Sequence, residues 1–150
     1  MMTVNKPFDA RRAVLAGLAG SAAYLAEQYL DLTLLRFPGD DLKLLGMVAT
    51  RRDPAWRVAG VATHFTNGTA LAIVYGLVAR DRLPGPPAVR GLLMGQLENA
   101  VLWPIVPLIV DRYHPAVREG LLPRLNTPVY AAQAILRHVA YGLVLGWIYG

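Results

Sequence analysis

Six ionisable side chains of this 150-residue sequence fall inside long apolar stretches, where they could bind an ion, hold a ligand or transfer a proton. Ionisable groups are costly inside a membrane, so they usually face the interior of a helix bundle and pair with one another. Two asparagines lie close to them in sequence and could add hydrogen bonds. The candidate ligand-binding or ion-binding residues are Glu27, Asp31, His64, Asn67, Glu98, Asn99, Arg137 and His138.

Arg137 needs an acidic partner, and its position within its apolar stretch predicts a pair with Glu98 or Glu27. Glu98 is favoured because it lies deeper in its own stretch, whereas Asp31 is expected to be shallow enough to reach water. Side-chain amides are expected to complete a hydrogen-bonded layer around these charges. The amides are those of Gln28, Asn67, Gln96 and Gln133.

Two alternatives give the histidines a chemical role. His64 and His138 could ligate a haem from opposite sides, or serve a quinone or a metal, in a membrane redox protein. Glu98 with either histidine could instead perform acid–base chemistry on a lipid-like substrate. The sequence holds no G-x-S-x-G or H-E-x-x-H motif and no cysteine, which excludes thiol chemistry and disulfides. No enzymatic activity is firmly predicted, and the cofactor is left open.

The elements that position these residues are predicted to be membrane-spanning helices. Only 17% of the residues are charged, compared with about 25% in soluble domains. Four stretches are almost free of charge: 13–35, 58–79, 91–110 and 125–150. Each has the roughly 20 apolar residues that a helix needs to cross a bilayer. We therefore expect an all-α polytopic membrane protein with four transmembrane helices, in contact with lipid and acting as a homo-oligomer or as a subunit of a membrane complex.

A shift of 74 residues aligns the two halves of the chain without a gap. It places His64 on His138, Gly68 on Gly142, and the Tyr-Gly pair at 75–76 on the pair at 149–150. Residues 1–150 are thus interpreted as a single transmembrane domain built from repeat units at about 11–76 and 85–150. Because each unit crosses the membrane twice, a 2+2 repeat with a pseudo-twofold axis along the membrane normal is expected.

The two connectors within the units are predicted to be short interfacial helices. Asp40 is a plausible N-cap with Gly46 as the helix stop, and Pro115 fits the first turn of the second connector. Trp56 and Tyr130 occupy the points where the chain re-enters the membrane, so they are expected to anchor at the interface.

The third apolar stretch contains two prolines that should break its helix. Pro104 and Pro107 lack backbone donors, which is expected to free the carbonyls of Ala100 and Trp103. Free carbonyls next to Glu98 could line a cavity.

The basic residues predict the orientation of the chain. Three lie before the first stretch and three lie between the second and third: Lys6, Arg11, Arg12, Arg80, Arg82 and Arg90. This distribution favours cytoplasmic termini in an inner-membrane, multi-pass protein. The net charge of +5 is then explained by topology and attraction to anionic lipid, not by nucleic-acid binding.

Short motifs around the second and third stretches resemble small bacterial inner-membrane proteins of the YagU type. They are His64-Phe-Thr-Asn-Gly68, Tyr75-Gly76 and Arg90-Gly-Leu-Leu-Met-Gly95. The resemblance implies a four-helix fold and an inner-membrane location, and it implies no chemistry. From the residues themselves we expect binding of a small ligand or ion, a role associated with transport, or an accessory role in a membrane complex.

Overall fold

A computed structural model describes residues 7–150 as a bundle of helices, and no strand occurs within that range. The long helices are α1 (Ala10–Leu34), α3 (Ala55–Val74), α4 (Pro87–Leu102) and α7 (Pro128–Tyr149). A π-helical turn extends α3 (η1, Tyr75–Ala79), and another follows α4 (η2, Val106–Val110). The connectors hold α2 (Asp41–Ala49), α5 (Asp111–Tyr113) and α6 (Pro115–Arg118). The predicted all-α class is confirmed.

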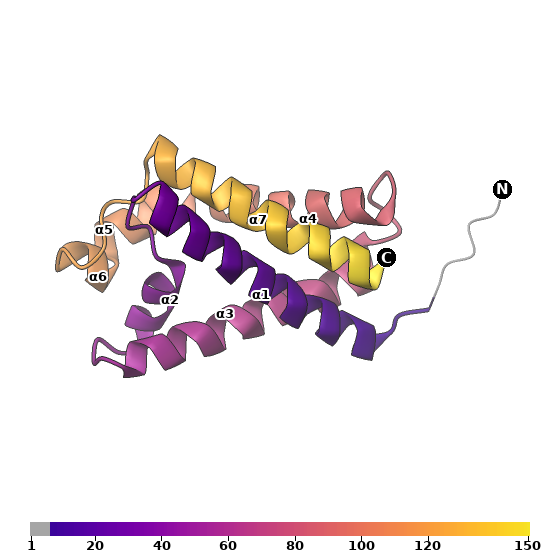
Figure 1. The fold of residues 1–150 in the computed structure, drawn as a ribbon, viewed down its shortest axis with the longest axis horizontal. Coiled ribbons are helices and arrows are strands. Elements are labelled where there is room, and N and C mark those ends of the chain that lie inside the picture. Colours follow the sequence, from indigo (N-terminus) through magenta and orange to yellow (C-terminus); the bar gives the residue numbers. More distant parts are fainter. Residues whose placement is uncertain (1–6) are drawn as a thin grey trace.

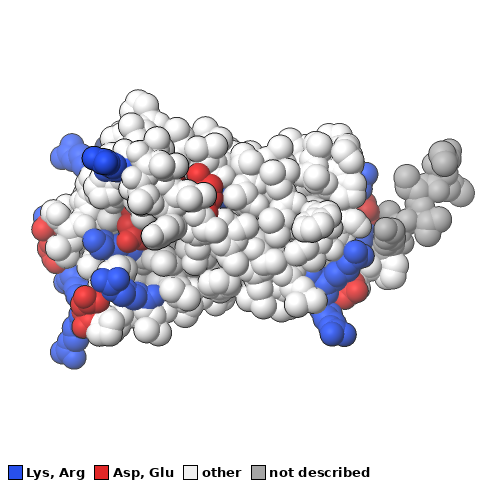
Figure 2. Space-filling model, viewed as in Figure 1, with Lys and Arg blue, Asp and Glu red and all other residues white. Residues whose placement is uncertain are grey.

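The bundle has two distinct ends. The described chain begins and ends at one of them, where the link between η1 and α4 also lies, and α2, α5 and α6 gather at the other (Figure 1). Along the bundle, α1 packs against α3 and α7, and α7 packs against α4. Figure 2 shows charged side chains collected at both ends and a nearly uncharged band between them, interrupted by one acidic patch. Such a band suits contact with the hydrocarbon core of a bilayer. Lys6, used above for orientation, lies outside the described residues.

Three helical stretches of residues 7–150, rather than the four predicted, are long and apolar enough to cross a membrane. They are Ala55–Ala79, Pro87–Tyr113 and Pro128–Tyr149. The 25-residue α1 has the length but not the composition. Its many small residues contribute little hydropathy, and Glu27 and Gln28 lower it further.

Side-chain caps and prolines set the helix starts. The Asp40 carboxylate accepts hydrogen bonds from the backbone N–H groups of Leu42 and Lys43 at 3.0 and 3.2 Å, which confirms it as the N-cap of α2. Pro115 occupies the first turn of α6, as predicted. Gly46 does not end α2, which continues to Ala49.

Gly46 instead lets α2 lie directly on α3. A Cβ atom at Gly46 would come within 1.9 Å of the Trp56 carbonyl oxygen, and one at Gly60 within 2.2 Å of the Leu42 carbonyl oxygen. Backbones can approach this closely only through glycine. The first connector therefore folds back against the bundle and brings its N-terminal residues toward the interior.

The interface anchors predicted at Trp56 and Tyr130 are wrong. Trp56 is only 7% exposed and packs in a cluster with Met47, while Tyr130 is 5% exposed and donates a hydrogen bond to Asp41. Both rings lie beneath the folded-back connectors, so protein covers them. A sequence shows where the chain turns but not what lies over the turn.

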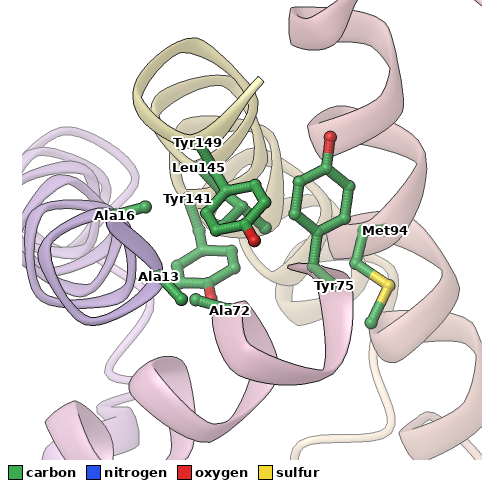
Figure 3. Packing of buried hydrophobic residues seen from close by; sticks show 8 residues of the cluster. All are labelled: Ala13, Ala16, Ala72, Tyr75, Met94, Tyr141, Leu145 and Tyr149. Atoms are coloured by element: carbon green, nitrogen blue, oxygen red, sulfur yellow. The ribbon is translucent and has the colours of Figure 1, made fainter. Parts of the chain in front are cut away.

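The main apolar cluster lies toward the end of the bundle where α4 begins, and Figure 3 shows its residues from close by. Tyr75, Tyr141 and Tyr149 stack among small residues of α1 and α3 and against Met94 of α4. The Tyr75 and Tyr149 rings meet edge to face at 5.8 Å. This cluster packs α4 against η1 and α7 at the end of the bundle where α4 begins.

The break predicted in the third stretch is present, because α4 ends at Leu102 and the helix resumes in η2. The prediction of a free Trp103 carbonyl is wrong, since it accepts a hydrogen bond from the Val106 N–H at 3.0 Å. The turn before η2 thus uses the acceptor that Pro107 leaves without its helical donor.

Candidate functional site

A fully buried arginine joins α1, α2 and α7. Arg137 is 0% exposed and grips Asp31 with two hydrogen bonds of 2.7 Å, from Nε to Oδ2 and from Nη2 to Oδ1. Its Nη1 donates to Asp41 Oδ2, also at 2.7 Å. Two-pronged arginine–carboxylate contacts are among the strongest polar interactions in proteins.

The favoured partner of Arg137, Glu98, is therefore wrong, whereas the alternative partner, Glu27, forms a more distant ion pair with it. Glu98 pairs with His138 instead, and Glu27 comes only to 4.0 Å from Arg137. Asp31, expected to reach water, is 3% exposed. Depth along a helix could not reveal this arrangement, because the second carboxylate comes from a connector that was placed outside the bundle.

Tyrosines and an amide donate further hydrogen bonds to the two carboxylates of this network. Tyr24 and Tyr130 each donate to Asp41 at 2.6 Å, and Gln133 Nε2 donates to Asp31 Oδ1 at 2.9 Å. The predicted amide layer is present in part, with Gln28 accepting from the Asp41 N–H at 3.3 Å. Asp41, Tyr24 and Tyr130 were missed as network residues.

Asp41 is held as a carboxylate. Burial raises its pKa, but Arg137 and the hydroxyls of Tyr130 and Tyr24 lower it more, so the pKa of Asp41 lies below its ordinary value. A group with a depressed folded pKa stabilises the fold above its unfolded pKa, and this contribution is lost as the pH falls through the folded value.

Stability should therefore fall in acid partly through Asp41. The thermal unfolding temperature of the protein is expected to drop as the pH falls below about 4, the usual aspartate range. An Asp41→Asn variant should be less stable at pH 7 and should lose part of this pH dependence. The exposed control Asp53→Asn should keep the full dependence. An unchanged pH profile in Asp41→Asn would contradict the assignment.

We call Arg137, Asp31, Asp41 and the side chains hydrogen-bonded to them the charge network. A cavity of about 540 Å³ opens next to it. We call it the α3/α4 cleft, because α3 forms one wall and α4 with η2 forms the other, while α1, α2 and α7 close its inner side. Most of its lining is apolar. The residues that border it include Ser21, Tyr24, Asp41, Leu44, Leu45, Val48, His64, Asn67, Gly68, Leu71, Glu98, Asn99, Leu102, Trp103, Ile105, Val106, Ile109, Val110, Tyr113, His114, Pro115, Tyr130, Ala134, His138 and Tyr141.

The cleft gathers five of the eight sequence-predicted site residues: His64, Asn67, Glu98, Asn99 and His138. The other three lie behind it, Asp31 and Arg137 within the charge network and Glu27 at its margin. The residues of the predicted polar layer thus divide between two sites. One is the closed ionic network, and the other is the open cleft with mostly apolar walls.

Glu98 and His138 form the central pair of the cleft. His138 Nε2 lies 3.6 Å from Glu98 Oε2, while its Nδ1 donates to the Ala134 carbonyl at 2.6 Å. With the proton on Nδ1, a neutral ring turns its Nε2 lone pair toward the carboxyl group. An acid facing a base in an apolar cleft can bind a polar head group or pass a proton.

The two histidines do not face each other. The Tyr24 ring lies between them, with centroids 4.9 Å from His64 and 5.2 Å from His138. His64 Nε2 donates to the Ser21 carbonyl at 3.1 Å, so its ring is already engaged. A haem would need the place that Tyr24 holds, and this geometry disfavours the bis-histidine alternative.

Ser21 adds an unused hydrogen-bonding group. Its side chain is 0% exposed and borders the cleft, and its hydroxyl has no hydrogen-bond partner among the described residues. An unpaired buried hydroxyl is costly. A bound molecule could satisfy it.

In the predicted repeat, the cleft falls between two helices whose counterparts are in close contact. In the 74-residue alignment of the two halves, α1 corresponds to α4 and α7 corresponds to α3. The contact of α1 with α7 therefore corresponds to that of α4 with α3. However, α1 and α7 pack closely, whereas α3 and α4 barely touch. The residues corresponding to Asp31 and Arg137 are Ile105 and Thr63. The ion pair between α1 and α7 thus has no counterpart between α3 and α4, which border the cleft.

These features define a class: an all-helical protein with three helices long and apolar enough to cross a membrane, one helix interface closed by buried charges and another open as an apolar cleft. The chain belongs to a family of unknown function, DUF6789, which matches residues 8–150. No curated protein and no solved structure matches it. The family match does not include the YagU-type proteins by name, so that resemblance remains an expectation.

Proposed function

We propose that the protein binds a small amphipathic molecule in the α3/α4 cleft, with the apolar part along the helix walls and the polar head at Glu98. The observation that carries the proposal is the cleft itself, which combines about 540 Å³ of mostly apolar space with convergent polar groups. Binding sites for small molecules typically combine these two properties.

The position of the cleft supports entry from the bilayer. Large apolar side chains at its margin are exposed, among them Leu102, Ile105 and Ile109. Leu102 is the last residue of α4 before the helix break, Ile105 and Ile109 follow the break, and all three belong to a candidate membrane span. A lipid-soluble molecule could thus reach Glu98 without crossing water.

We propose α1 as a fourth crossing, because its Gln28 and Asp31 side chains make their hydrogen bonds inside the protein. Asp31 and Gln28 are buried, and Leu15, Leu18 and Leu30 are exposed on its outer surface. Arginines at the end where the described chain begins and ends support the proposed cytoplasmic orientation in an inner membrane. Binding would serve transport or an accessory role in a homo-oligomer or a membrane complex.

A second candidate function is acid–base chemistry on a bound lipid-like molecule. The 3.6 Å approach of Glu98 to His138 inside the cleft favours it. Binding comes first in either case, so the test below applies to both.

Filling the cleft should abolish binding. We expect a diazirine-bearing long-chain alcohol, added to the protein in lipid nanodiscs and photoactivated, to label cleft residues that mass spectrometry then maps. Val106→Trp places an indole in the cleft and should reduce this labelling at least tenfold. Its matched control, Leu108→Trp, lies on the same π-helical turn, exposed and outside the cleft lining.

Leu108→Trp should be labelled like the wild type. Both variants should show the thermal unfolding of the wild type, so that a loss of labelling reports on the cleft. Equal labelling of Val106→Trp and wild type at cleft residues would overturn the proposed function.

A further inference from the structure

The Asp, Glu, Lys and Arg side chains that border the cleft in the described chain are all acidic. Among the residues that border it in the described chain, no lysine or arginine occurs, whereas Asp41 and Glu98 are both acidic. A phosphate or carboxylate head group would find no cation to pair with there. Complementary charge is a main source of selectivity in binding.

The network behind the cleft does not balance its own charge. Arg137 is one cation shared by two carboxylates, Asp31 and Asp41, each at 2.7 Å. Asp41 is also the network member that borders the cleft. Its lowered pKa keeps it ionised, so the inner end of the cleft carries excess negative charge.

Glu98 lacks a cationic partner within hydrogen-bond distance. Its nearest basic group, His138 Nε2, lies at 3.6 Å, and His138 already donates through Nδ1 to a backbone carbonyl. In an apolar cleft, the ionised form of a carboxyl group is stabilised by an opposite charge close to it. A ligand is a natural source of that charge.

Aromatic rings border the same space. Tyr24, Trp103 and Tyr141 come from α1, the end of α4 and α7, and they border the cleft together with Glu98 and His138. Aromatic faces attract organic cations such as quaternary ammonium groups. Rings and carboxylates together form a lining suited to an amine.

We infer that the cleft selects an amphiphile with a positively charged head, a protonated or quaternary amine, which lies at Glu98 while its apolar chain follows η2. This inference rests on the proposed function and names its ligand class. Anionic lipids, which lack any cationic partner in the cleft, are excluded from it by charge.

The test compares three photoreactive amphiphiles with one diazirine-bearing chain and different heads: trimethylammonium, hydroxyl and phosphate. In wild-type protein in zwitterionic nanodiscs, cleft labelling by the trimethylammonium probe should exceed that by the alcohol at least fivefold, and the phosphate probe should label least. Glu98→Gln, which keeps the side-chain shape, should remove most of the preference for the trimethylammonium probe.

The matched control is Glu119→Gln, an exposed carboxylate that pairs with Arg51 on the connector. It should keep the full preference. Equal labelling by all three heads in the wild type would overturn the inferred ligand class while leaving cleft binding intact. If no probe labels the cleft, the proposed function fails as well. The comparison of heads in wild-type protein needs no variant to fold.

Discussion

Replacing Arg137 with alanine is expected to destabilise the protein by about 3–5 kcal/mol, the usual cost of leaving buried charges without their partner. Both carboxylates of the network would lose their cation, and Asp31 would keep only its bond from Gln133. Because the fold is held by a margin of similar size, most of the variant should fail to accumulate as folded protein. Thermal unfolding in nanodiscs and the yield of monodisperse protein measure the effect.

The control for this variant is Arg57→Ala. Arg57 pairs with Asp53 at 3.0 Å, but both side chains are more than half exposed, so the loss should stay within about 1 kcal/mol. A second variant that replaces Arg137, Asp31 and Asp41 together by leucine should recover stability relative to Arg137→Ala. If Arg137→Ala unfolds like Arg57→Ala, the network does not hold the helices together.

The sequence predicted the helices better than their partners. Long uncharged stretches identify helices of membrane-spanning length. Such a stretch can be recognised from its own length and composition, without knowledge of its neighbours. Composition then separates α1 from the other three, since it carries Glu27, Gln28 and Asp31. The polar residues that make it less apolar are those it turns toward the rest of the protein.

Residue type identified Arg137 and Asp31 as candidate site residues, but it did not show that they pair with each other. The bond of Arg137 to Asp41 depends on α2 folding back onto α3. The close contact of Gly46 with Trp56 allows this and brings Asp41 within reach. No depth estimate contains that contact. The cleft was equally hidden, because it lies between α3 and α4, which have no ion pair like the one between α1 and α7.

The contact of α4 with α7 depends on glycine at position 91. A Cβ atom there would lie 2.2 Å from the Gly142 carbonyl oxygen and 2.4 Å from the Gly146 nitrogen, both backbone atoms that cannot move aside. Gly91→Val should therefore force the helices apart and destabilise the protein by about 3 kcal/mol, the upper range for overpacking. Unfolding by heat or by denaturing detergent measures the loss.

Ala100→Val is the matched control, because it adds methyl groups to the same helix at an exposed position. It should cost well under 1 kcal/mol, the small helix-propensity difference for a β-branched residue. The two variants separate packing from propensity, since both place valine in α4. If they unfold alike, α4 and α7 are not in backbone contact. The cleft wall built on α4 would then lose its support, because α4 is fixed to the bundle chiefly through α7.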